Sequence, residues 1–101
     1  VRLSRGLGDV YKRQFQNYPN PFNPSTQISF DIPKSEFITL RIFNLLGQDV
    51  KTLASKVMNP GRYSFEWDGK DLLSSDVASG VYFYELRGES FISRKKMLLI
   101  R

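Results

Sequence analysis

The chain has 101 residues and a mass of 11.7 kDa, which is enough for one small domain. Hydrophobic residues make up 41% and charged residues 25%, and this near-average balance excludes a wholly disordered chain. The sequence has no cysteine and no histidine, which excludes disulfide bonds, histidine-bound metals and a Ser-His-Asp catalytic triad. No apolar run approaches the roughly 20 residues that span a bilayer, so we expect no stable membrane insertion.

The net charge of +5 is concentrated at the start of the chain, in residues 1–14. These carry four basic residues against one acidic residue, whereas residues 15–101 carry eleven against nine. Residues 4–14, SRGLGDVYKRQ, match an in-frame translation of a transposase sequencing-library adapter residue for residue. We therefore interpret residues 1–14 as an adapter-derived leader that is not native, and exclude them from fold reasoning. Without the leader little excess positive charge remains, and we expect no nucleic-acid partner.

Residues 15–25 are an Asn/Pro-rich segment ahead of the first alternating apolar pattern. The segment contains three prolines, two of which follow an asparagine. Proline fixes φ and pushes the preceding residue toward extended geometry, so this composition predicts turns or polyproline-like backbone. We expect a linker in which Tyr18 and Phe22 act as aromatic anchors.

Alternation of apolar and polar residues predicts β-strands through the rest of the chain. The aromatic content of 14% also favours an all-β core. The last segment contains a helix-compatible run at 95–100, where we nevertheless predict a strand. The predicted strands span residues 27–32, 38–42, 48–53, 62–67, 81–86 and 90–100.

Short strands spaced about ten residues apart predict a small immunoglobulin-like antiparallel β-sandwich of six or seven strands over residues 26–101. A small barrel of similar strand number is the alternative, because periodicity does not separate the two. The segment 81–86 is apolar on both faces apart from Glu85, which indicates a central position in its sheet. One core between two sheets is expected to contain Ile28, Phe30, Leu40, Ile42, Phe65, Trp67 and Tyr82.

Residues 44–48, Asn-Leu-Leu-Gly-Gln, have the composition of a hairpin connection. In such a turn Gly47 takes a positive φ, which glycine adopts without steric cost. This arrangement can leave Leu45 or Leu46 exposed at the tip, either as a packing residue or as a contact point. We favour packing.

Acidic residues near residue 70 raise the question of a metal or catalytic site. Asp68, Asp71 and Asp76 offer the oxygen ligands that calcium prefers, but their spacing is not that of an EF-hand loop. Glu66 and Asp68 have the residue types of a glycosidase pair, yet a strand-to-turn step makes their side chains diverge. We therefore expect no catalytic residue, no metal and no cofactor.

The basic run Arg94–Lys96 has the composition of a nucleic-acid or membrane-surface patch. A strand places these three side chains on alternating faces, so no continuous basic stripe forms. The run instead predicts an edge strand whose charges discourage pairing with another sheet.

Five short motifs in order resemble the C-terminal sorting domain of the bacterial type IX secretion system. They are NYPNPFNPST at 17–26, LRIFNLLGQDV at 40–50, WDG at 67–69, VASGVYFY at 77–84 and KMLL at 96–99. The middle and end of the chain are also similar to the related immunoglobulin-like module of the flagellar hook-capping protein. The sequence departs from the family at Ser74, where a glycine is common, and we expect a local deviation in that loop.

The resemblance implies a non-catalytic targeting function, in which the domain directs an upstream passenger through the outer membrane by type IX secretion. It implies the type IX machinery as partner, a missing N-terminal passenger, and a secreted or cell-surface location reached via the periplasm. We expect a monomer. The recognition candidates are Lys96, Met97, Leu98, Leu99, Ile100 and Arg101, with Gly80, Val81 and Tyr82 as the neighbouring framework.

The alternative function is a structural, adhesive or carbohydrate-binding immunoglobulin-like appendage of a secreted protein, and an enzyme is a more distant third. Exposed coplanar aromatic side chains on one sheet face favour carbohydrate binding. A core that uses the aromatic side chains disfavours it. The residues that decide are Tyr63, Phe65, Trp67, Tyr82 and Tyr84.

Overall fold

A computed structural model describes residues 15–101, and residues 1–14, which we interpret as the leader, lie outside this range. The described residues form six strands and no helix, so nothing among them has the length and apolarity of a membrane-crossing helix. The last strand is a strand and not a helix, as predicted. The strands are β1 (Thr26–Ile32), β2 (Glu36–Phe43), β3 (Asp49–Met58), β4 (Gly61–Trp67), β5 (Gly80–Arg87) and β6 (Ile92–Leu99).

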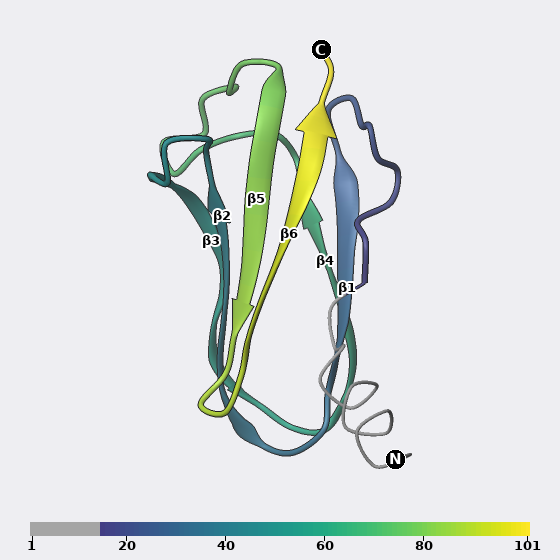
Figure 1. Cartoon of the computed structure of the whole chain (residues 1–101), viewed down its shortest axis with the longest axis vertical. Coiled ribbons are helices and arrows are strands. Elements are labelled where there is room, and N and C mark those ends of the chain that lie inside the picture. Colours follow the sequence, from purple (N-terminus) through teal and green to yellow (C-terminus); the bar gives the residue numbers. More distant parts are fainter. Residues whose placement is uncertain (1–14) are drawn as a thin grey trace, which may run out of the picture.

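The strands form two antiparallel sheets that face each other as an immunoglobulin-like sandwich (Figure 1). One sheet contains β1 and β4, and the other has the order β3-β2-β5-β6. The sandwich prediction is therefore confirmed over the barrel, with six strands. The central position expected for β5 is also confirmed, because β5 pairs with β2 on one side and β6 on the other.

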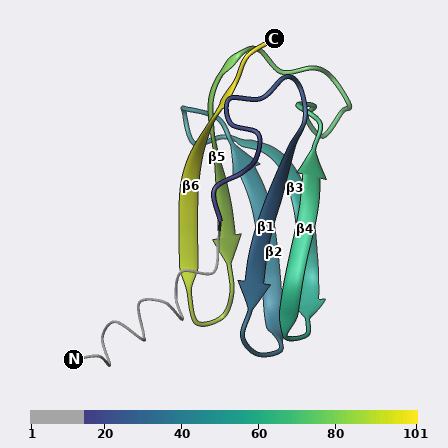
Figure 2. The same cartoon turned by 90° about the vertical axis from the view of Figure 1, so that its right-hand side faces the viewer.

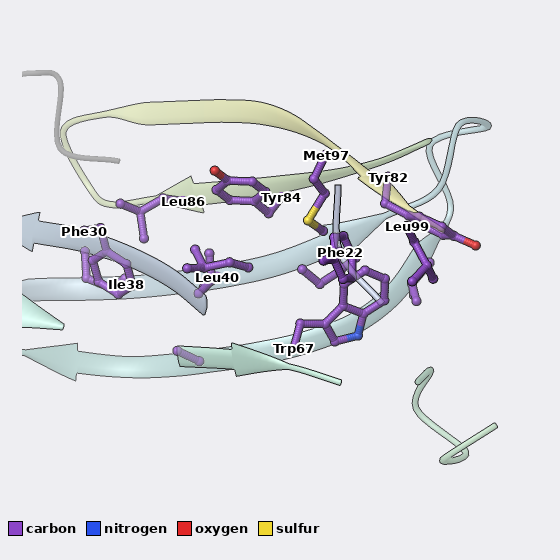
Figure 3. Close-up of a cluster of buried hydrophobic side chains, with 14 of the residues drawn as sticks. Phe22, Phe30, Ile38, Leu40, Trp67, Tyr82, Tyr84, Leu86, Met97 and Leu99 are labelled. Atoms are coloured by element: carbon purple, nitrogen blue, oxygen red, sulfur yellow. The ribbon is translucent and has the colours of Figure 1, made fainter. Parts of the chain in front are cut away.

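Period-two alternation in the sequence becomes a buried face and an exposed face on β1 and β2. Their buried apolar residues point into the space between the sheets, where side chains from all six strands contribute to the core. Figure 3 shows part of this core. Six of the seven expected core residues are buried, and Phe65 is half-buried. Phe65 lies on β4, at the edge of the smaller sheet, and its ring stacks on Phe30 with centroids 5.8 Å apart.

Strand β3 runs to Met58, five residues beyond the predicted end at Leu53. Two register irregularities in its pairing with β2 interrupt the alternation. Its buried residues consequently fall four apart, at Val50, Ala54 and Met58. This spacing is not the period of two that identifies a strand from sequence, which explains the early end of the predicted strand.

Two loops lie at the same end of the sandwich as the C-terminus (Figure 1). In the β2–β3 connection Gly47 has a φ of +83°, as predicted for the hairpin. The packing expected at its tip is wrong, because Leu45 and Leu46 are 68% and 82% exposed. In the loop between β4 and β5, Ser74 has a φ of +64°, so this serine adopts a left-handed conformation that normally favours glycine.

Candidate functional site

Antiparallel pairing of β5 and β6 brings most of the sequence-predicted recognition residues together. Gly80 pairs with Leu99, Val81 with Leu98, and Tyr82 with Met97. The framework residues 80–82 therefore lie directly beside residues 97–99 in the same sheet. Of the remaining candidates, Lys96 lies within β6 opposite Phe83, and Ile100 and Arg101 follow the end of the strand.

The two faces of β6 present different chemistry. Met97 and Leu99 are buried in the core, whereas Lys96, Leu98 and Ile100 are exposed. On the exposed side lies a shallow hollow of about 250 Å³, lined by Asn20, Val81, Lys96, Met97 and Leu98. Only the exposed set is available for direct recognition by another protein.

The Asn/Pro-rich segment lies along the outer edge of β6, on the side away from β5. The Phe22 N–H donates to the Leu98 carbonyl at 3.0 Å, and the Ile100 N–H donates to the Phe22 carbonyl at 2.9 Å. Asn20 Oδ1 accepts the Leu98 N–H at 3.0 Å, and Gln16 Nε2 donates to the Lys96 carbonyl at 3.0 Å. The last part of β6 therefore has a hydrogen-bonding neighbour on both sides.

The same segment also contacts β1, so it runs between the two sheets (Figure 2). Tyr18 and Gln27 exchange backbone hydrogen bonds. The side-chain amide of the buried Asn17 donates to Thr26 Oγ1 at 2.9 Å. Tyr18 is nevertheless 79% exposed, so its ring is not the anchor that the sequence suggested.

Phe22 is the aromatic anchor of the segment. Its ring is buried in the core, 5.7 Å from the centroid of Trp67. Trp67 in turn packs edge-on against Tyr82 at 5.3 Å (Figure 3). A residue of the N-terminal segment thus takes part in the same aromatic cluster as the framework of the recognition strand.

Tyr84 joins β5 to the start of the described chain. Its hydroxyl accepts the Asn17 N–H and donates to the Phe15 carbonyl, each at 2.8 Å. The side chain is fully buried, and burial disfavours the charged phenolate. Desolvation raises the pKa of Tyr84 to about 12, although the hydrogen bond from Asn17 acts in the opposite direction.

The Arg101 side chain folds back onto the loop between β4 and β5. Its guanidinium donates to the carbonyls of Gly69 and Val77, each at 2.6 Å, and its backbone N–H donates to Ser79 Oγ at 2.8 Å. Nη2 also lies 3.7 Å from Asp76 Oδ1. Lys70, and to a lesser degree Arg101, hold the pKa of Asp76 below its ordinary value. Arg101 is thus fixed by the domain itself.

Each of the three aspartates of this loop has a hydrogen-bond partner within the domain. Asp68 accepts the backbone N–H of Lys70, Asp71 accepts backbone N–H groups of its own turn, and Asp76 pairs with Lys70. Within residues 15–101, no three or more acidic, cysteine or histidine side chains are grouped so as to hold a metal ion.

The basic run on β6 divides between the two faces of the strand. Arg94 lies on the outer face, where it pairs with the buried carboxylate of Glu85 at 2.9 Å and lies over the ring of Phe43. Lys95 is half-buried on the opposite face, and Lys96 is exposed. The alternation expected for a strand is confirmed, and no continuous basic stripe forms.

The strand order and the facing sheets define a small immunoglobulin-like module. The family of secretion system C-terminal sorting domains matches residues 16–100, so the match includes most of the Asn/Pro-rich segment. The chain belongs to this family. No curated protein matches the sequence.

Solved structures of low sequence identity share the fold. PorZ of Porphyromonas gingivalis, an essential surface component of the type-IX secretion system, has a TM-score of 0.64 and 19% identity over 85% of this chain. Dimeric latent PorU of the same organism has a TM-score of 0.67 and 16% identity over 86%. This chain spans only 11% of the length of the PorZ chain and 9% of the PorU chain.

The flagellar protein FlgD from Xanthomonas campestris, described for hook capping, also has this fold. Its TM-score is 0.60, with 20% identity over 97% of this chain and 74% of that chain. These likenesses show an architecture, whereas the family match assigns the sorting class.

Proposed function

We propose that this domain directs an upstream passenger protein across the outer membrane by type IX secretion, after transit through the periplasm. The observation that carries the proposal is the match to the C-terminal sorting-domain family over residues 16–100. The fold shared with PorZ, a component of the type-IX system, is consistent with it. The passenger protein leaves the cell or is displayed on its surface.

The proposed mechanism is recognition, which requires no catalytic group. The exposed side chains of Lys96, Leu98 and Ile100 contact the export machinery, and the buried Met97 and Leu99 fix their direction. A cation beside apolar side chains and a shallow hollow suits a protein surface that offers both a carboxylate and an apolar group. We expect the domain itself to act as a monomer.

A fusion experiment tests this function. The full chain is placed behind a folded reporter with a secretory leader, in a host that has the type IX machine, and the reporter is measured outside the cell. We expect export of the wild-type fusion and its loss in the double variant Lys96→Glu, Leu98→Ser. At exposed positions each change should alter the free energy of unfolding by no more than about 0.5 kcal/mol.

The matched control is Lys56→Glu, Val57→Ser, which changes the same kinds of exposed side chain on β3, the opposite edge of the same sheet. This control fusion should be exported normally. Equal export of both variants would contradict the recognition site. A wild-type fusion that stays in the periplasm would contradict the sorting function.

An adhesive or carbohydrate-binding module is the function to pursue if export fails. The aromatic side chains give little support to carbohydrate binding, because Trp67, Tyr82 and Tyr84 are buried and Tyr63 and Phe65 pack against the core. The exposed leucines at the loop end offer one apolar surface for adhesion. These are Leu45, Leu46, Leu72 and Leu73.

A further inference from the structure

The last part of β6 is held in place from the far end of the described chain. Leu98 is bonded to Asn20 and Phe22, residues 78 and 76 positions earlier in the sequence. Two of the four hydrogen bonds along this edge are made by the side chains of Gln16 and Asn20, and two by the backbone of Phe22. We call residues 16–22 the clip.

The clip matters because β6 is at the edge of its sheet. An edge strand leaves every second N–H and C=O unpaired, and chain ends open with free energies near zero. Here the clip takes up these groups between Lys96 and Ile100, where the recognition candidates lie. At such a position, the loss of a single hydrogen bond lowers the fraction of molecules in which the end of β6 is docked on the domain.

We propose that the clip is a positioning element of the sorting site. It holds β6 in the conformation that the export machinery reads, and Asn20 also forms a wall of the hollow beside Lys96 and Leu98. The inference rests on the proposed sorting function. It gives the Asn/Pro-rich segment a role different from that of a linker between passenger and domain.

Hydrogen exchange tests the clip without any export machinery. The clip variant Gln16→Ala, Asn20→Ala removes both side-chain bonds to β6 and leaves Phe22 in the core. In the purified full chain we expect the Leu98 amide to exchange about tenfold faster, and Ile100 to follow, while amides in the centre of β2 are unchanged. An unchanged rate at Leu98 would overturn the proposal.

The matched control is Asn23→Ala, Gln27→Ala. It makes the same kinds of residue change in the same region. Gln27 lies on β1 and accepts a hydrogen bond from Ser64 on β4, in the sheet that does not contain β6. The melting temperature of each variant is measured to confirm that it folds. A third variant carries the single change Asn20→Asp, which keeps an oxygen that can accept the Leu98 N–H. In this variant the Leu98 amide should exchange as slowly as in the wild type.

Export of the reporter fusion provides the second test. Recognition weakens with the fraction of molecules in which the strand is docked, so we expect export of the clip variant to fall about threefold or more. The control should be exported like the wild type. Faster exchange at Leu98 with normal export would overturn the positioning role. Failure of the wild-type fusion would instead contradict the sorting function, and the exchange rates would still show whether the clip holds β6.

Discussion

Ser74 adopts a φ of +64° in the loop between β4 and β5, a region that costs a non-glycine residue about 1–2 kcal/mol. The turn persists because Asp71 Oδ1 accepts the N–H groups of Leu73 and Ser75. Replacing Ser74 with glycine removes the steric cost but adds freedom to the unfolded chain. We expect Ser74→Gly to raise the free energy of unfolding by about 0.5–1 kcal/mol, measured by chemical denaturation.

The inverse change at Gly47 is the control for this prediction. Gly47 has a φ of +83° and open space where a Cβ would point, so Gly47→Ser adds only backbone strain. It should lower the free energy of unfolding by about 1 kcal/mol. If Ser74→Gly destabilises the domain as Gly47→Ser does, the left-handed conformation of Ser74 is wrong.

Tyr84 predicts a loss of stability in alkali. Its pKa is about 12 in the folded domain and about 10 in the unfolded chain, so the folded state favours the neutral phenol. This contribution is fully present below pH 10 and is lost as the pH rises toward 12. Because one pKa unit corresponds to about 1.4 kcal/mol, roughly 2–3 kcal/mol is at stake.

Tyr84→Phe isolates the effect, since it removes the ionisation and keeps the ring. At pH 8 the variant should be less stable by about 1–2 kcal/mol, because the buried Asn17 N–H loses its acceptor. Denaturation curves between pH 8 and 12 should show the wild type losing this advantage above pH 10. A constant difference across that range would rule out a raised pKa of Tyr84.

At the level of the elements, Phe22 distinguishes a linker from a packed segment. Phe22→Ala should cost about 3–5 kcal/mol, as for other buried phenylalanines. Phe65→Ala, at a half-buried position on β4, should cost clearly less, about 1–2 kcal/mol. Urea denaturation of both variants gives the comparison. A smaller loss for Phe22 than for Phe65 would mean that the segment does not pack as described.

Strands that bury one face could be predicted from the sequence, whereas contacts that depend on distant partners could not. The alternation in β1 and β2 is visible because one face of each strand meets the core. The end of β3 was missed because register irregularities with β2 moved its buried residues four apart. Packing was wrongly favoured for Leu45 and Leu46, because the composition of a turn does not reveal what lies beside its tip.

The candidate site was predicted only in part, for the same reason. Residues 80–82 and 96–99 could be paired because both segments carry strand patterns and belong to motifs of the family. Phe22 was predicted as an aromatic anchor, but the hydrogen bonds of Asn20 and Phe22 to β6 were not predicted, since proline-rich composition is typical of a linker and carries no periodicity. To predict that the Asn/Pro-rich segment lies along β6, one would have to know that β6 is at the edge of its sheet.

At the scale of the whole molecule, the two ends of the described chain depend on each other. Residues 15–24 bond to β1, β5 and β6, and Arg101 bonds to the loop between β4 and β5. Gly69 is needed at this meeting point, because a Cβ there would lie 2.8 Å from Arg101 Nη2 and 3.0 Å from the Pro24 carbonyl. The domain therefore extends beyond its six strands.

Two truncations measure this dependence. Removal of residues 1–14, which we interpret as an adapter-derived leader, should leave the melting temperature within about two degrees. Removal of residues 1–25 takes away the buried Phe22, the partner of Tyr84 and the outer neighbour of β6. A loss of about 3–5 kcal/mol corresponds to a drop of more than about 12 °C in a domain of this size, and the shorter chain should unfold near ambient temperature or fail to fold. Calorimetry of the two truncated chains gives their melting temperatures. Equal melting temperatures would mean that the Asn/Pro-rich segment is a linker. A large drop on removing residues 1–14 alone would mean that the leader belongs to the domain.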